Sequence, residues 1–404
     1  MKLFTPNFIK FIIALESHLI AKTLIRFAIP LFVLLETGNP TLMGTVLSIS
    51  ALPLIILTPI GGTLSDRFNK KRLLQITNAT SAIFIIIHIL INPNGDNITL
   101  IILIMALIAI VESFITPTNE ASLPLIVGKE NLVKANSITF LCTNFSSIGA
   151  PLLGGFLLYR FNLFTILVVI GFFYLLSSFL YLTIKIPKTN TVNKTSNIVK
   201  GLLSDIITGI KFVTTEKKSV GKIIFIVFLL AITLITSMTI AVPTLMVTYF
   251  KFPEHLIGIS QGIVVAGGTL AAIILPKFGD KIGVHKSQCI IFIPAVTVVA
   301  TDLILLVNDT NHLNFVIVVA CFFICQIFLT MYGVLYFSFL GTKTPSEAMG
   351  KVMGLAISTS VLGFAIGDFI HGLLFSKFIE VPGIVLIIIG LLAVGVGLFE
   401  KVEE

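Results

Sequence analysis

Long apolar runs separated by short polar segments cover almost the whole chain. Polar segments such as 92–97 and 308–311 are only a few residues long. A helix needs about 20 mainly apolar residues to cross the hydrocarbon core of a membrane. The runs predict twelve transmembrane helices, at 8–34, 41–61, 74–92, 98–118, 135–158, 163–184, 221–249, 256–276, 288–307, 314–340, 351–375 and 383–399.

The composition favours an all-α integral membrane protein over a soluble one. Hydrophobic residues make up 56% of the 404 positions and charged residues 11%, whereas soluble domains carry roughly 25% charged residues. The first run contains Glu16, Lys22 and Arg26, and no small-residue cleavage site follows it. We therefore expect this run to remain as a span and not to be a signal peptide.

The net charge of +8 is explained by membrane topology and not by nucleic-acid binding. Basic residues concentrate in the segments on one side of the predicted spans, and the loops on the other side hold only Arg160, Lys251 and Lys377. Positive loops stay in the cytoplasm, so both termini are expected there. The lysines and arginines assigned to the cytoplasmic side are Lys2, Arg67, Lys70, Lys71, Arg72, Lys129, Lys134, those between 185 and 222, Lys277, Lys281, Lys286, Lys343, Lys351 and Lys401.

The longest polar stretch, 185–220, divides six predicted spans from six. Within it, apolar residues recur at helical spacing between Ile198 and Val213, which predicts an amphipathic helix on the inner membrane surface or a simple tether. We thus expect a six-helix bundle at 1–184, a cytoplasmic linker at 185–220 and a second six-helix bundle at 221–404. Segments 64–72 and 278–286 share the order aspartate, base, apolar residue, turn-former and trailing bases, which predicts a parallel repeat.

The loop after the second span carries the most specific motif, Gly61-Gly62-Thr63-Leu64-Ser65-Asp66-Arg67-Phe68-Asn69-Lys70-Lys71-Arg72. It resembles the signature of the major facilitator superfamily, with asparagine in place of the second glycine. The resemblance implies two bundles with a central substrate site and a latch that holds the outward-facing state. The implied latch residues are Gly62, Asp66 and Arg67, with Asp280 and Lys281 in the paired loop. Alternatively, the basic residues serve only to fix topology.

Two further stretches, 114–137 and 203–212, resemble the macrolide and multidrug efflux branch of that superfamily. The fifth span carries most of the antiporter signature, as Gly149, Pro151, Gly154 and Gly155, with the first glycine displaced by one position. The fourth span lacks the arginine that exporters often carry and offers Glu112 instead. The resemblance implies a proton antiporter for efflux and antibiotic resistance, and these departures weaken that implication.

Charged residues inside the predicted spans mark a candidate substrate and proton cavity. Each such charge costs roughly 2.5–3.5 kcal/mol on insertion scales, so it marks function by default. On the first span His18, Lys22 and Arg26 share one face and Glu16 lies further round. We expect Glu16 and Glu112 to approach each other or to share these bases. Asp368, with His371 nearby, is a further candidate.

Two interpretations of these charges stay open. Burial and a nearby base act on the pKa of a carboxylate in opposite directions, and a proton-coupled carrier needs such tunability, so Glu112 or Glu16 is a candidate proton site. The alternative is a static ion pair with Lys22 or Arg26. The bases of the first span are also compatible with an anionic or zwitterionic cargo, such as a siderophore or a lysophospholipid.

The predicted function is therefore a secondary active transporter, with proton-coupled efflux of amphipathic small molecules as the first hypothesis. The alternatives are an exporter or flippase of an anionic metabolite or lipid, and a non-transporting receptor on the same fold. No His-Glu-x-x-His, nucleotide loop or Gly-x-Ser-x-Gly occurs, which argues against an enzyme and against a primary pump. The expected partners are a small-molecule substrate, protons and the lipid bilayer, with no nucleic acid. We expect a monomer.

The four cysteines, Cys142, Cys289, Cys321 and Cys325, all fall within apolar runs. We interpret them as small apolar residues of the helix interior, because neither a disulfide framework nor a metal-ligand spacing is present. We therefore expect no metal and no cofactor.

Overall fold

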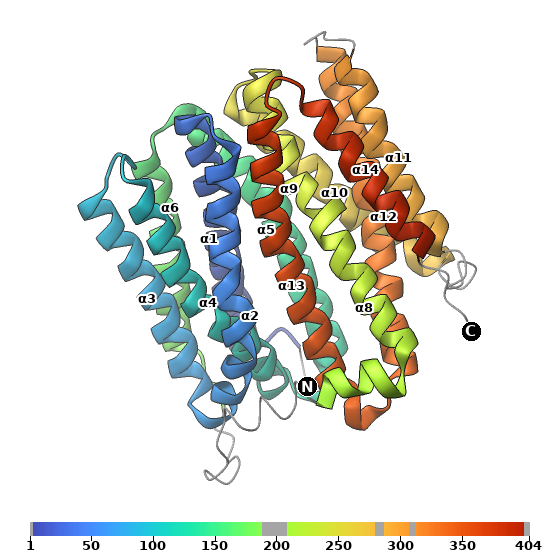
Figure 1. Ribbon diagram of the computed structural model, residues 1–404. Coiled ribbons are helices and arrows are strands. Elements are labelled where there is room, and N and C mark those ends of the chain that lie inside the picture. Colours follow the sequence, from blue (N-terminus) through green and yellow to red (C-terminus); the bar gives the residue numbers. More distant parts are fainter. Residues whose placement is uncertain (1–2, 188–207, 279–286, 307–311, 400–404) are drawn as a thin grey trace. The chain divides into compact units, whose positions relative to one another are not determined.

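The computed structural model describes residues 3–187, 208–278, 287–306 and 312–399 (Figure 1). The chain divides into two compact units. The first contains Met1–Phe32 and Ile49–Leu202, and the second contains Val33–Ser48 and Leu203–Glu404. The short segment Val33–Ser48 thus packs with the second unit, which the predicted boundary at residue 184 does not include.

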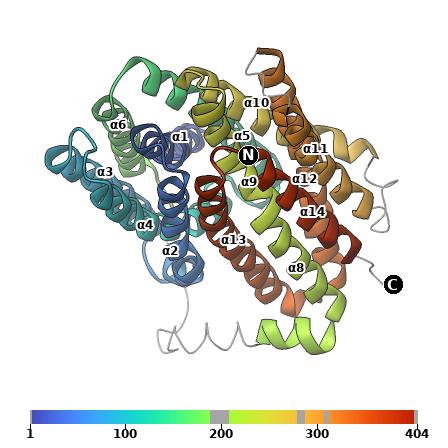
Figure 2. The same ribbon diagram turned by 45° about the horizontal axis from the view of Figure 1, so that its top comes forward.

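Six long helices build the first unit, except that the end of α1 and the start of α2 fall in the segment Val33–Ser48 of the second unit. α3 packs along α6 and α4 (Figure 2). Three of the helices begin at asparagines, because the side chains of Asn69, Asn97 and Asn162 each accept a hydrogen bond from a backbone N–H of the first turn. The bounds are α1 (Pro6–Thr37), α2 (Pro40–Arg67), α3 (Lys70–Ile91), α4 (Ile98–Val127), α5 (Leu132–Arg160) and α6 (Leu163–Thr183), with a 3-10 turn η1 (Lys129–Asn131) before α5.

The second unit begins, in the described residues, with a helical turn at 208–211 and the π-helical η2 (Phe212–Glu216). A continuous apolar segment then runs through α8 (Lys218–Leu230), η3 (Ala231–Ile235), α9 (Thr236–Thr244) and η4 (Leu245–Tyr249), with π-helical geometry in η3 and η4. The remaining helices are α10 (Glu254–Phe278), α11 (Ser287–Leu306), α12 (His312–Lys343), α13 (Ser346–Lys377) and α14 (Pro382–Phe399).

Glycines on α13 allow close packing within the second unit. A Cβ on Gly363 would lie 2.7 Å from Cβ of Ala231, and a Cβ on Gly367 would lie 2.8 Å from the carbonyl oxygen of Ile232. The small residues four apart therefore let α13 cross η3 at close range, as small-residue motifs do between membrane helices.

The helices agree with the all-α membrane class. Among the described residues, ten helical segments are long and apolar enough to cross a membrane, and α11 and α14 contain shorter apolar stretches, Ile290–Thr301 and Pro382–Leu398. Each of the twelve predicted runs falls on a helical segment. The multi-pass helical fold is therefore confirmed, and the count of twelve spans stays a prediction.

One predicted bound differs from the structure in an informative way. The sequence predicts that the fourth run ends at residue 118, yet α4 continues through Pro117 and Pro124 to Val127. A membrane helix tolerates such prolines because neighbouring helices and side chains satisfy the backbone groups that the prolines leave without hydrogen bonds. Most of the amphipathic helix predicted between 198 and 213 lies outside the described residues.

Candidate functional site

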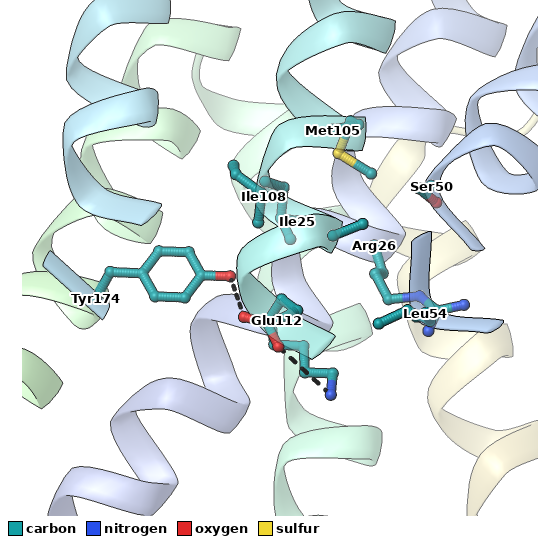
Figure 3. Close-up of a pocket in the computed structure, with 10 residues that line it drawn as sticks. Ile25, Arg26, Ser50, Leu54, Met105, Ile108, Glu112 and Tyr174 are labelled. Atoms are coloured by element: carbon teal, nitrogen blue, oxygen red, sulfur yellow. Dashed lines mark hydrogen bonds and ion pairs between the residues drawn. The ribbon is translucent and has the colours of Figure 1, made fainter. Parts of the chain in front are cut away.

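Glu112 of α4 is the centre of a buried polar cluster in the first unit. It is 5% exposed. Tyr174 of α6 donates its hydroxyl hydrogen to Oε1 of Glu112 at 3.1 Å (Figure 3). The other oxygen, Oε2, lies 3.4 Å from Nε2 of His18 and 3.5 Å from Nζ of Lys22. The carboxylate thus has a hydroxyl donor on one oxygen and two basic groups on the other.

Helix periodicity explains why α1 supplies both basic groups. His18 and Lys22 are four residues apart, so they lie one above the other on the same face of α1. Glu112 and Thr116 have the same spacing on α4, and Lys22 Nζ also donates to Oγ1 of Thr116 at 3.5 Å. Two matched pairs therefore face each other across the contact between α1 and α4.

His18 is held from a third helix as well. Its Nδ1 lies 3.1 Å from Oδ1 of Asn78 on α3, and both residues are buried. The Asn78 amide nitrogen donates to the carbonyl oxygen of Leu74 at 2.7 Å. The imidazole ring is therefore fixed between α3 and α4, with each ring nitrogen facing an oxygen.

A small cavity of about 30 Å³ lies next to this cluster. It is lined by Lys22, Arg26, Ser50, Glu112 and Tyr174 together with apolar residues of α1, α2 and α4. Arg26 is exposed and makes no ion pair with any described acid. Its guanidinium is directed away from Glu112, on the side of Leu54 (Figure 3). The cavity therefore has one cation that is paired and one that has no described counter-ion.

A larger cavity of about 480 Å³ opens beside His18, between α1, α4 and α5. Its polar lining consists of one acid, the imidazole, and hydroxyl and amide groups, while its apolar lining includes Phe11 and Leu15 of α1. This volume is within the roughly 300–1,000 Å³ range of small-molecule sites. The polar residues are His18, Thr116, Asn119, Glu120, Asn136, Thr139 and Thr143.

The remaining predicted cavity residues lie elsewhere. Glu16 accepts a hydrogen bond from Oγ of Ser146 on α5 at 2.7 Å and makes no ion pair in the described part of the chain, so the expected sharing of bases with Glu112 is wrong. The physical reason is its angular position on α1, which faces α5 and not α4. Asp368 belongs to the second unit and is buried on α13, where His371 Nδ1 lies 3.0 Å from Oγ1 of Thr236.

The structure describes only part of the predicted latch. Asp280 and Lys281 lie outside the described residues, as do the side-chain surroundings of Gly62, Asp66 and Arg67. The described neighbour Lys70 is buried, and its Nζ donates to the carbonyl oxygen of Ser65 at 2.8 Å. This lysine therefore closes the end of α2 onto the start of α3 instead of projecting into water.

The glycine that brings α2 against α4 is Gly61, next to the predicted Gly62. A Cβ on Gly61 would lie 2.5 Å from the carbonyl oxygen of Ser113 and 3.1 Å from Cα of Phe114. Ser113 directly follows Glu112 in the chain, so this crossing sets the position of α4 at the polar cluster.

The packing motif of α5 has one residue in close contact. A Cβ on Gly154 would lie 2.8 Å from Cδ1 of Phe27 and 3.0 Å from Cδ1 of Leu24, both on α1. A Cβ on Gly149 would meet nothing within 4 Å. Pro151 and Gly155 are buried within the same helix. The motif therefore serves the contact between α5 and α1 at Gly154.

Sequence reasoning missed Tyr174, Asn78 and Glu120. Tyr174 and Asn78 lie within apolar runs, and no motif or residue spacing in the sequence marks either of them as part of a site. A signal was available for Asn78, because an amide in a membrane helix requires a buried partner. Cys142, Cys321 and Cys325 are free, and no group of three metal-binding side chains occurs in the part of the chain that the structure describes.

Comparison with known proteins places this geometry in a family. The sequence profile of the Major Facilitator Superfamily matches residues 12–368. The chain belongs to the Major Facilitator Superfamily. The resemblance seen in the loop after the second span is confirmed at this level, and the chain is a multi-pass membrane protein of a transporter family.

Two curated relatives are named as transporters of staphyloferrin A and of enterobactin. The staphyloferrin A transporter of Staphylococcus aureus (strain NCTC 8325 / PS 47) is 27% identical over 255 residues, covering 62% of this chain and 62% of the relative. The enterobactin exporter EntS of Shigella boydii serotype 4 (strain Sb227) is 26% identical over 157 residues, covering 38% of this chain and 37% of the relative. Both matches span less than two thirds of the relative. The macrolide and multidrug branch is not confirmed.

Solved structures support the fold. The nucleoside transporter NupG has a TM-score of 0.79 at 13% identity, with 99% of this chain and 100% of that chain covered. A bacterial homologue of the iron transporter ferroportin, in an inward-facing state, has a TM-score of 0.73 at 15% identity, with 99% and 100% covered. At these identities the likeness shows the fold alone.

Proposed function

We propose that this protein is a secondary active exporter of an anionic, siderophore-class small molecule, working by alternating access in the inner membrane of a bacterium. In this proposal the chain has twelve spans in two six-helix bundles joined by the linker at 185–220, and both termini are cytoplasmic. The observation that carries the proposal is Arg26, which stands beside Lys22 without a counter-ion among the described residues. The siderophore class comes from the relatives, whose named cargoes are staphyloferrin A and enterobactin.

The charges around the small cavity favour an anionic cargo. Lys22 and Arg26 line the small cavity with one acid, Glu112, which also contacts His18. A second acid, Glu120 of the larger cavity, lies within electrostatic reach of Lys22 but is not paired with Arg26 among the described residues. A charge within a span is expensive, so an uncompensated cation there calls for a partner. Siderophores bind iron through hard oxygen donors, many of which are anionic when iron-free. An anionic oxygen group of the cargo would supply the missing partner of Arg26.

The two cavities divide the work of binding. The small cavity has about 30 Å³, room for about one water, and therefore takes only the end of a functional group. The larger cavity of about 480 Å³ is lined by hydroxyl and amide donors and acceptors together with apolar residues such as Phe11 and Leu15. We assign the body of the cargo to the larger cavity, with its anionic group directed along α1 toward Lys22. The Lys22 side chain is 24% exposed and remains accessible for this contact.

A second candidate is the proton-coupled efflux of amphipathic small molecules, of the macrolide type. The apolar part of the larger cavity, with Phe11, Leu15, Leu123 and Leu132, favours it. The excess of basic groups around the small cavity argues against cationic drugs. An anionic lipid cargo remains an outcome of the same experiment, because it would use the same two cations.

A deletion strain grown under iron limitation tests the proposed function. The siderophore in the medium and in the cytoplasm is measured by mass spectrometry, after complementation with the wild type, with Arg26→Gln or with an empty vector. We expect siderophore to accumulate inside cells without the gene and to leave when the wild type is restored, and we expect Arg26→Gln to restore export poorly. Unchanged siderophore distribution, with greater macrolide sensitivity of the deletion strain, would favour the second candidate.

Transport by purified protein separates a carrier from a receptor. Proteoliposomes loaded with the siderophore and subjected to an imposed pH gradient or membrane potential should release it only when the protein is present. In this assay the latch proposal is tested by Asp66→Asn and Asp280→Asn. Each is expected to slow release by weakening the outward-facing state while leaving cargo binding in place.

A further inference from the structure

His18 has an oxygen atom facing each of its ring nitrogens. Oδ1 of Asn78 lies 3.1 Å from Nδ1, and Oε2 of Glu112 lies 3.4 Å from Nε2. His18 is 1% exposed and Asn78 is fully buried. Within this buried contact the ring must match its hydrogen atoms to these two oxygens.

The orientation of the Asn78 amide is set by its other bond. Its Nδ2 donates to the carbonyl oxygen of Leu74 at 2.7 Å. A flipped amide would place its oxygen at that distance from the Leu74 oxygen, with no hydrogen between them. Oδ1 therefore faces His18, and because a carboxamide oxygen only accepts, Nδ1 of His18 carries a hydrogen.

The opposite nitrogen lies 3.4 Å from Oε2 of Glu112, at ion-pair distance, and Oε2 itself makes no hydrogen bond with a described residue. A neutral ring protonated at Nδ1 would present the lone pair of Nε2 to this carboxylate, an unfavourable contact between two acceptors. The contact becomes favourable when a proton lies between Nε2 and Oε2. The Lys22 ammonium, 3.5 Å from the same Oε2, favours the ionised form of Glu112, so this proton belongs to the imidazole. The geometry is that of an imidazolium held between an amide oxygen and a carboxylate.

We propose that His18 carries the coupling proton of this transporter, and that this proton and an anionic cargo group at Lys22 and Arg26 favour each other's binding. The second half rests on the proposed function, and the first half does not. Protonated His18 adds a positive charge one helical turn from Lys22. It also gives Glu112 a cationic partner that stays in place when Lys22 turns to the cargo.

The charged neighbours of His18 agree with this assignment. On α1 the neighbouring base is Lys22, with Arg26 a further turn away, and the acid Glu16 is bonded to Ser146 of α5. On α4 the acids are Glu112 and Glu120. α6 contributes Tyr174, whose ring centre lies 6.0 Å from the imidazole and whose hydroxyl is directed at Glu112. α3 contributes the neutral Asn78. Glu112 is thus the single described acid in contact with the ring, and it is the group that stabilises the proton.

The sign of the coupling follows from reciprocity. If the His18 proton strengthens anion binding by some factor, the anion strengthens proton binding by the same factor. Cargo and proton then bind together, whereas exchange at one site would require that each displaces the other. A cargo with two or more negative charges still leaves with a net negative charge, and an inside-negative potential favours its exit.

The coupling is measured by calorimetry on the purified full chain in lipid nanodiscs. Iron-free staphyloferrin A is the probe, titrated between pH 6 and pH 8 in two buffers of different ionisation enthalpy, so that protons taken up are counted. We expect the wild type to take up a fraction of a proton per bound probe and to lose about tenfold in affinity over this pH range, within the ~5–150-fold span of typical couplings. His18→Gln should show neither effect. Uptake that persists in His18→Gln, or proton release by the wild type, would overturn the coupling.

Asn78 variants separate positioning from a structural role. Asn78→Leu removes the acceptor at Nδ1 and allows the neutral ring to donate from Nε2, so the pH midpoint of binding should fall. Asn78→Asp keeps an acceptor and adds a charge, so the midpoint should rise. Shifts in opposite directions are not produced by general loss of structure. Glu16→Gln, which removes a neighbouring acid of α1 bonded to Ser146, is the matched control and should leave the midpoint unchanged.

A direct titration decides the proton site without any cargo. Ring-nitrogen NMR of ¹⁵N-histidine-labelled protein, with His18→Gln to identify the signals, should show that His18 exchanges a proton between its singly and doubly protonated forms over the pH range in which the probe's affinity changes. A His18 that keeps one protonation state throughout that range would overturn the assignment. If the wild type binds no anionic probe, the proposed function and the coupling both fall, while the NMR result still stands for or against the proton site.

Discussion

Tyr174 on α6 holds Glu112 on α4 from the side opposite α1, with its hydroxyl 3.1 Å from Oε1. The tyrosine is fully buried. One oxygen of the acid is thereby occupied, and the other is left for the basic groups of α1. Tyr174 thus orients the carboxylate through Oε1, whereas His18 and Lys22 contact the other oxygen, Oε2.

Replacing Tyr174 by phenylalanine should remove a hydrogen bond to Glu112 without creating a cavity in the core. The ring remains, but Oε1 loses its donor, and a hydrogen bond to a charged group contributes about 1.5–3 kcal/mol. We expect a loss of thermal stability of this order and a shifted pH dependence of cargo binding, measured by unfolding in detergent and by calorimetry.

Tyr181→Phe is the matched control for this change. Tyr181 is also fully buried on α6, but its hydroxyl donates to the neutral Oδ1 of Asn119, at 2.7 Å. Its loss should reduce stability and leave the pH dependence as in the wild type. Equal pH dependence in both variants would contradict the role assigned to Tyr174.

The sequence was sufficient for the helices and for part of the site. Apolar run length located the helices, and the four-residue spacing of His18 and Lys22 predicted their shared face. The sequence was insufficient to say which of several neighbouring helices a given side chain contacts. Glu16 lies far enough round α1 to face Ser146 of α5, and angular spacing alone does not say which helix stands there. Tyr174 and Asn78 reach the cluster through tertiary packing of α6 and α3, which no local pattern encodes.

Variants of Lys22 and Arg26 should distinguish effects on stability from effects on cargo binding. Arg26 lies within a span and has no described ion pair, so Arg26→Gln breaks no described ion pair and removes an uncompensated charge, and stability should be unchanged or higher. Lys22→Gln removes one partner of a buried acid, a change that costs up to about 3–5 kcal/mol when no other partner remains. His18 still contacts Glu112, which keeps the loss below that range.

Both variants should nevertheless bind an anionic cargo at least about tenfold more weakly, a difference of about 1.4 kcal/mol. Thermal unfolding and cargo titration on the same preparations give the two quantities. Arg26→Lys, which keeps the charge, is expected to retain much of the affinity. An Arg26→Gln protein that binds cargo as the wild type does would remove Arg26 from the site.

The α5 motif offers a pair of glycines for comparison. Gly154→Ala places a methyl group 2.8 Å from the Phe27 ring and 3.0 Å from Leu24, so α5 must move away from α1. Overpacking of this kind costs about 1–3 kcal/mol. Gly149→Ala meets nothing within 4 Å and should be neutral or slightly stabilising, because alanine favours the helix. Thermal unfolding of the two variants, with transport in proteoliposomes, tests the difference, and equal behaviour would show that the motif has no packing role here.

Gly61→Ala should affect the polar cluster from a distance. The added Cβ would lie 2.5 Å from the Ser113 carbonyl oxygen and 3.1 Å from Cα of Phe114, and backbone atoms cannot rotate away as a side chain does. α2 and α4 must therefore separate or shift, and Glu112, the residue before Ser113, moves with α4. We expect lower stability together with weaker coupling between pH and cargo binding, measured by unfolding and by calorimetry. Gly149→Ala again serves as the control, since it adds the same methyl group to a membrane helix in open space. Normal pH coupling in a destabilised Gly61→Ala protein would show that the geometry at Glu112 does not depend on this crossing.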